Sequence, residues 1–141
     1  MQDFTAENAE KRRAITAGYN EIGEKIIGAA IRVHSALGPG LLEGVYEICL
    51  CHELTKAGLR IQRHVPLPVS YDGVSLEIGY RLDILVADTV VVEIKAVESV
   101  IPLHLAQLLG YLKLGKFKLG YLLNFNVVKL RDGIRRLVND L

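Results

Sequence analysis

Three charged residues interrupt the most apolar part of the chain. Residues 83–98 read DILVADTVVVEIKAVE, so that Asp83 opens the stretch and Glu93 and Lys95 stand among valines and isoleucines. Burial of an unpaired carboxylate or ammonium group is strongly unfavourable. These charges therefore either face water or serve a function that offsets the cost of burying them.

A β-hairpin about residues 87–89 would bring the two acids together. With the turn centred on Asp88, Asp83 lies directly opposite Glu93. The same register places Arg81 opposite Lys95. Directly opposed side chains on one sheet face have Cβ atoms about 5 Å apart. The hairpin thus predicts two carboxylates and two cations in one small patch.

Two carboxylates at that spacing repel each other unless a positive charge lies between them. A divalent cation would relieve the repulsion, and hard oxygen ligands favour Mg²⁺ or Mn²⁺. Such an ion polarises phosphate groups and activates water, and Lys95 beside it can stabilise developing negative charge. The alternative is a ladder of diagonal ion pairs, Asp83 with Lys95 or Arg81 with Glu93, on a solvated sheet face.

The elements that must position this patch follow from the hydrophobic periodicity. Residues 1–19 are polar, and we expect a flexible segment there, ahead of a single domain of residues 20–141. The hairpin signal Asp72-Gly73 separates two of the strands. A short strand or helix is expected from Leu130 onward. The remaining predicted elements are helices at 20–37, 41–57 and 99–116 (with Ser99 as N-cap), and strands at 59–73, 74–86, 89–97 and 117–127. This order predicts an α/β protein with a mixed sheet and helices on its faces.

Composition narrows the class of protein. A chain of 141 residues is long enough for one domain with a core. Half of the residues are hydrophobic, yet no apolar run approaches the ~20 residues of a membrane span. No signal peptide is visible at the start, so we expect a cytoplasmic protein without a membrane partner. The apolar surplus would serve a well-filled core or a homodimer interface.

Charge is unevenly distributed along the chain. The net charge is +1, but from Tyr111 onward seven Lys and Arg residues stand against two acids, which leaves −4 for residues 1–110. The basic part, which includes Lys113 and Lys116, suits contact with a polyanion such as nucleic acid. A solvated surface is the alternative reading.

The spacing D-x9-E-x-K across a hairpin, followed by a helix, resembles the signature of the PD-(D/E)XK nuclease superfamily. Gln107 and Tyr111 form a Q-x3-Y pair on one face of that helix, as in the exonuclease-like branch of the superfamily. Residues 40–46, GLLEGVY, match the G-x2-E-x2-Y motif of the GxxExxY proteins with Gly40, Glu43 and Tyr46. The resemblance extends over nearly the whole chain. The proline that usually precedes the first acid is replaced by Leu82.

The resemblance implies a restriction-endonuclease-like α-β-β-β-α-β core with an additional N-terminal helix. It also implies that Asp83, Glu93, the Ile94 carbonyl and Glu43 bind Mg²⁺ or Mn²⁺, and that Lys95 is catalytic. Gln107 and Tyr111 would then support the site. For Glu43, the alternative is an ordinary glutamate on the helix surface.

Further residues are candidates for supporting roles. Arg81 either binds a phosphate or pairs with the acids, while His34 and Tyr46 are candidates for support behind the site. The expected function is a Mg²⁺-dependent nuclease acting on DNA, with RNA as the alternative substrate. The alternative is a non-catalytic nucleic-acid-binding or dimerisation module, or an accessory subunit, that retains the fold.

Overall fold

A mixed sheet forms the centre of the molecule, in agreement with the predicted α/β class. The computed structural model describes residues 2–141, and the side chains of all of these except residues 2–4, 77 and 78. Within these residues, five strands lie in the order β1-β2-β3-β4-β5. All neighbours are antiparallel except β3 and β4, which are parallel. The strands are β1 (Ile61–Tyr71), β2 (Val74–Val86), β3 (Val90–Lys95), β4 (Leu119–Asn124) and β5 (Ile134–Val138).

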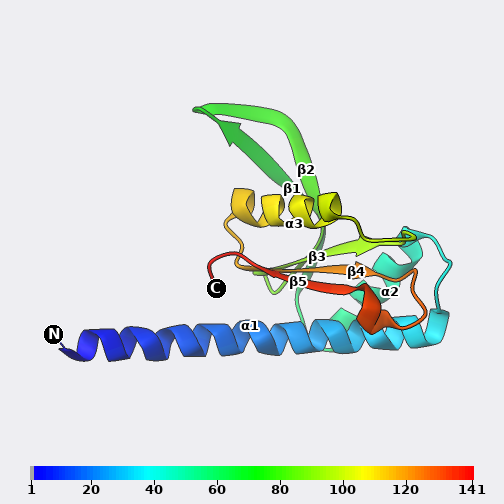
Figure 1. The fold of residues 1–141 in the computed structure, drawn as a ribbon, viewed down its shortest axis with the longest axis horizontal. Helices are drawn as coiled ribbons and strands as arrows, with labels where there is room; N and C mark the ends of the chain where they lie inside the picture. Colours follow the sequence, from blue (N-terminus) through cyan, green and yellow to red (C-terminus); the bar gives the residue numbers. More distant parts are fainter. Residues whose placement is uncertain (1) are drawn as a thin grey trace.

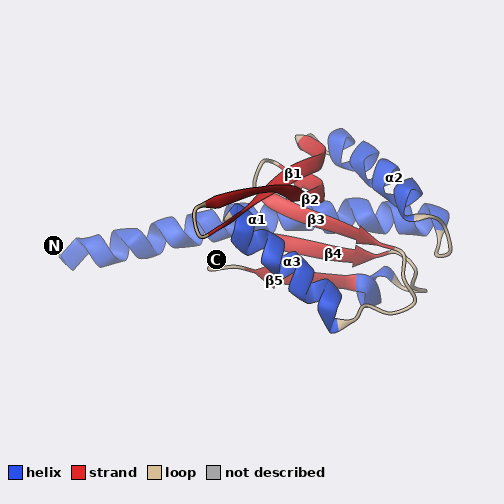
Figure 2. Ribbon diagram, turned by 90° about the horizontal axis from the view of Figure 1, so that it is seen from above, coloured by secondary structure: helices blue, strands red, loops and turns tan. Residues whose placement is uncertain are grey.

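Helices cover both faces of the sheet (Figures 1 and 2). Helices α1 (Gln2–Leu37) and α2 (Glu43–Lys56) pack on one face, where Ile26, Leu50 and Ile84 share a core cluster. Helix α3 (Pro102–Gly115) packs on the other face, where its Leu108 and Leu112 form a second cluster with Leu85, Val91 and Leu122. Helix α3 also provides the crossover that the parallel strands β3 and β4 require. The order of elements is the predicted α-β-β-β-α-β core with an additional N-terminal helix.

Helix α1 begins at Gln2 rather than near Asn20, so the loose segment predicted for residues 1–19 is helical from Gln2 onward. The segment contains good helix formers and no proline, and Glu7 and Lys11 have a favourable i, i+4 spacing. We predicted a loose segment because these residues are polar and carry no apolar stripe. Their helix propensity is sufficient to form the helix without one. No helix within the described residues is long and apolar enough to cross a membrane.

Strands β1 and β2 form a long ribbon that leaves the rest of the sheet and stands over α3 (Figure 1). The predicted turn at Asp72-Gly73 is confirmed: Tyr71 pairs with Val74, and φ is +49° at Asp72 and +76° at Gly73. Strand β2 pairs with β3 only from Ile84 to Val86. The ribbon is therefore free of β3 over most of its length.

Two further boundaries differ from or refine the predictions. Helix α3 begins at Pro102 with Ile101 as its N-cap, so the prediction of Ser99 as N-cap was wrong. The Nδ1 atom of His104 accepts a hydrogen bond from the Ile101 N–H (3.1 Å) and thus satisfies a free donor at this end of the helix. The C-terminal tail forms a 3₁₀ turn, η1 (Leu130–Gly133), followed by strand β5.

Candidate active site

The β2–β3 hairpin has the predicted register. Val86 pairs with Val90, and Leu85 and Ile84 pair with Val91 and Val92 respectively. Residues Ala87 and Asp88 in the turn have φ values of +52° and +60°. Continuing this register places Asp83 opposite Glu93.

The two acids are connected through the backbone at the point where the ladder ends. The Asp83 N–H donates to Glu93 Oε1 (3.2 Å), and the Ile94 N–H donates to Asp83 Oδ2 (2.8 Å). Carboxylate oxygens thus accept bonds from main-chain donors just beyond Ile84 and Val92, the last paired residues of the β2–β3 ladder. These reciprocal bonds hold each carboxylate against the opposite strand.

Glu93 lies in an environment that opposes its ionisation. Its side chain is buried, with the residue only 8% exposed. Burial and, second, the negative charge of Asp83 raise the pKa of Glu93 to about 8, while the positive charge of Lys95 acts in the opposite direction. No ion pair joins these acids to Lys95 or Arg81 within the described residues. The alternative of a salt-bridge ladder therefore does not describe this patch.

The carboxylate pair fits a hard divalent cation. Asp83 Oδ1 and Glu93 Oε2 accept no protein hydrogen bond in the part of the chain that the structure describes, whereas the other oxygen of each group is held by the backbone. Burial and the charge of Asp83 oppose the ionisation of Glu93, and a bound cation would offset both effects. Oxygen donors of this kind suit Mg²⁺ or Mn²⁺, and the main-chain carbonyl of Ile94 is adjacent in sequence.

Glu43 does not join the two acids. It is the first residue of α2 and is exposed. Among the described residues, no three His, Cys, Asp or Glu side chains come together to form a group that could hold a metal ion. The predicted metal ligand set is therefore assembled only as far as Asp83 and Glu93.

The two residues of the predicted Q-x3-Y pair, Gln107 and Tyr111, differ in exposure. Tyr111 packs against the cluster that contains Val91, two residues before Glu93. Burial and then the charge of Glu93 raise the pKa of Tyr111, with smaller contributions from Tyr80 and Asp83. Its ring centroid is 5.2 Å from that of Tyr80 on β2. Gln107, one helical turn earlier, is exposed.

The predicted nucleic-acid-binding cations lie on the surface. Arg81 is exposed, and the β2–β3 ladder ends at Ile84 and Val92, so the predicted pairing of Arg81 with Lys95 was wrong. The ribbon has left β3 by this point, which separates the two cations. Lys113 and Lys116 are exposed at the C-terminal end of α3. None of the three makes an ion pair within the described part of the chain.

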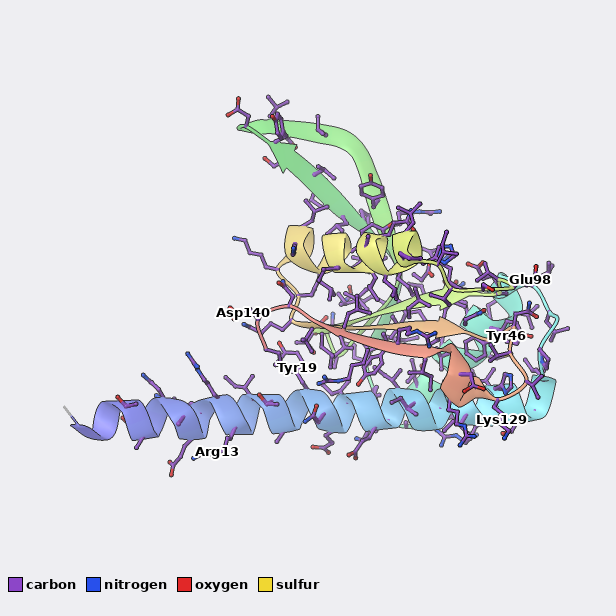
Figure 3. The ribbon with its side chains drawn as sticks, in the orientation of Figure 1. Arg13, Tyr19, Tyr46, Glu98, Lys129 and Asp140 are labelled. Atoms are coloured by element: carbon purple, nitrogen blue, oxygen red, sulfur yellow. The ribbon has the colours of Figure 1, made fainter. Side chains whose placement is uncertain are left out.

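His34 and Tyr46 make structural contacts on the face of the sheet that α1 and α2 cover. His34 Nε2 donates to the Val127 carbonyl (2.7 Å). The buried Tyr46, labelled in Figure 3, donates to the Gly38 carbonyl (2.7 Å) and accepts from the Leu41 N–H (3.0 Å). Its ring stacks on Phe125, with centroids 4.6 Å apart and planes 9° apart. His34 thus ties α1 to the segment after β4, and Tyr46 holds the loop between α1 and α2.

Two residues, Glu47 on α2 and Tyr80 on β2, were missed from the sequence. Buried Glu47 binds Arg63 Nη2 (2.5 Å) and His64 Nε2 (2.9 Å) of β1. The i, i+4 spacing of Glu43 and Glu47 indicates that they share a helix face. The residues around Glu47 in the sequence gave no indication of its partners on β1. Tyr80 had no signal, because its contact with Tyr111 depends on how the ribbon lies over α3.

Comparison with known proteins agrees with this geometry. Residues 20–137 match the family model described as the PD-(D/E)XK nuclease superfamily. No curated protein and no solved structure matches the chain. The family match covers most of the sequence, including Asp83, Glu93 and Lys95, and it begins where the apolar face of α1 begins. The chain therefore belongs to the PD-(D/E)XK nuclease superfamily, whose members are generally nucleases.

Proposed function

We propose that the protein is a divalent-metal-dependent nuclease that hydrolyses phosphodiester bonds in DNA. The observation that carries the proposal is the interlocked pair Asp83 and Glu93, in which a buried acid faces a like charge and lacks an ion-pair partner among the described residues. Membership of a nuclease superfamily supports the same reading.

Asp83 and Glu93 would hold Mg²⁺ or Mn²⁺, together with the Ile94 carbonyl. When bound, such an ion polarises the phosphate and lowers the pKa of coordinated water. Lys95, two residues after Glu93, orients the attacking water and offsets charge that develops on the phosphate oxygens. Attack by the water oxygen on phosphorus would form one P–O bond as the P–O bond to the leaving sugar oxygen breaks, and the proton lost by the water would pass through solvent to that oxygen. Tyr111 would support the acids from α3.

Surface cations provide the affinity for the backbone of the nucleic acid. Arg81 is exposed two residues from Asp83, and Lys113 and Lys116 extend the basic surface along α3. Phosphate contacts by such side chains position the substrate without reading its sequence. Binding should therefore weaken as salt concentration rises.

Cleavage assays with matched variants test the proposal. Purified protein is incubated with DNA and RNA, single- and double-stranded, in Mg²⁺, Mn²⁺ or EDTA. Wild type should cleave DNA only with metal, and Asp83→Ala and Lys95→Ala should each lose about 10²-fold or more of the rate. Glu43→Ala is the control for an acid outside the pair and should retain cleavage. Persistent cleavage by Asp83→Ala would show that the assigned site is wrong.

A second candidate is a non-catalytic binding or dimerisation module. The observation that favours it is the set of exposed apolar side chains on the ribbon, which includes Tyr71, Val74 and Leu76. Sedimentation analysis separates the candidates: a stable dimer with no metal-dependent cleavage of any substrate supports the module.

A further inference from the structure

Two aromatic pairs in the molecule have contrasting surroundings. Tyr46 and Phe125 are stacked nearly parallel and fully buried, as expected for a pair that stabilises a core. Tyr80 and Tyr111 are tilted by 42° with centroids 5.2 Å apart, and Tyr80 is 52% exposed. The tilt means that Tyr111 does not cover the ring of Tyr80 face to face. About half of Tyr80 is therefore accessible to a ligand, three residues before Asp83 on β2.

The packing of the ribbon fixes the position of this open ring. Leu67 and Leu82, from the two strands of the ribbon, share a core cluster with Leu108 and Leu112 of α3, and Tyr111 packs against that cluster. Tyr80 precedes Asp83 by three residues on β2. Three residues of an extended strand span about 10 Å, which keeps Tyr80 near Asp83. The charges of Glu93 and Asp83 also contribute to the raised pKa of Tyr111. Arg81, the next residue of β2, is also exposed.

We propose that Tyr80 and Tyr111 form a stacking platform for an unpaired nucleobase next to the acidic pair, so that the substrate is a single strand or an unpaired end. The proposal rests on the proposed function in taking a nucleic acid as the ligand. Bases within a duplex are already stacked on both faces, and only an unpaired base offers its face to the platform. Stacking on an aromatic side chain is tolerant of sequence because every base has a π-face.

Fluorescence titrations test the platform without relying on cleavage. The probe is a single-stranded oligodeoxynucleotide that contains 2-aminopurine, and its duplex is the comparison, both in EDTA. Wild type should quench 2-aminopurine and bind the single strand more tightly than the duplex. Tyr80→Leu, which keeps apolar volume but removes the π-face, should weaken single-strand binding about 10-fold and abolish quenching. Tyr80→Phe should retain both.

Tyr71→Leu is the matched control, since Tyr71 is 75% exposed at the turn of the same ribbon. It should bind the single strand like wild type. The platform is overturned if Tyr80→Leu binds and quenches like wild type, or if wild type prefers the duplex. These results are independent of cleavage by wild type in Mg²⁺. Loss of quenching in Tyr80→Leu together with no metal-dependent cleavage would support the platform and reject the nuclease.

Discussion

Glu47 and Glu93 are buried to nearly the same extent, with 7% and 8% of each residue exposed, but their partners differ. Glu47 accepts from the guanidinium of Arg63 and from the ring of His64. Glu93 accepts from one main-chain N–H and faces the carboxylate of Asp83. One acid has its opposite charge within the fold, whereas the other faces a like charge.

This difference separates a structural acid from a candidate functional one. A buried carboxylate is tolerated when cations and hydrogen bonds compensate its charge, as Arg63 and His64 do for Glu47. Glu93 lacks that compensation among the described residues, and its pKa is raised as a consequence. A site that binds a cation from solution needs such a surplus of negative charge. The following predictions test whether the two glutamates differ in this way.

The largest expected difference is in catalysis. Glu93→Gln removes a proposed metal ligand with little change in shape and should reduce metal-dependent cleavage by about 10²-fold or more. Glu47→Gln should leave cleavage largely intact, because its partners lie on β1 and not at the acidic pair. Initial rates in Mg²⁺ measure both. Equal losses in the two variants would contradict the distinction.

The second difference is in the pH dependence of stability without metal. The pKa of Glu93 is about 8 in the folded protein, above its ordinary value of 4.5, so the folded state binds the proton more tightly than the unfolded state. Its stabilising contribution is complete below pH 4.5 and is lost as the pH rises through 8, at a cost of about 5 kcal/mol.

Urea unfolding in EDTA at several pH values measures this loss. Glu93→Gln should remove this component of the slope, whereas Glu47→Gln should keep it. Mn²⁺ should restore stability at pH 8 in wild type, because the ion binds the folded state. An unchanged slope in Glu93→Gln would show that another group is responsible.

The third difference is in stability at fixed pH. Glu47→Gln loses charge-assisted hydrogen bonds to Arg63 and His64, and should lower the free energy of unfolding by about 1–3 kcal/mol. Arg63 and His64 are partly exposed, so water compensates part of the loss. Urea unfolding at pH 7 gives the value, and calorimetry with Mn²⁺ should show unchanged affinity. A loss of Mn²⁺ binding would place Glu47 at the metal site instead.

The smallest expected effect concerns Lys95. Its positive charge lowers the pKa of Glu93, against the larger effects of burial and Asp83. Lys95→Met should therefore raise the pKa of Glu93 further. Carbon-13 NMR titration of the Glu93 carboxyl in EDTA measures the change. A lowered pKa would mean that Lys95 does not act on Glu93 as a cation.

Much of the fold and part of the site could be predicted because the signals are local. Alternating apolar residues and the turns at Asp72-Gly73 and Asp88 predicted the strands and the register that brings Asp83 to Glu93. The start of α1 was missed because exposed helices depend on propensity and carry no apolar stripe. Arg81 was misplaced because strand register was extended past the point where the ribbon leaves β3.

The sequence by itself determined the elements, the hairpin register and the superfamily, since hydrophobic period, turn residues and motif spacing act over short distances along the chain. Only the tertiary structure decided which acids lie together, which acids have their charge compensated by basic side chains, and which aromatic ring remains exposed to solvent. Glu43 and Glu47 are one helical turn apart, yet packing of α2 on β1 buries Glu47 against two basic side chains and leaves Glu43 exposed. Burial and charge compensation depend on contacts between distant segments, and these form only when the helices and the ribbon pack on the sheet.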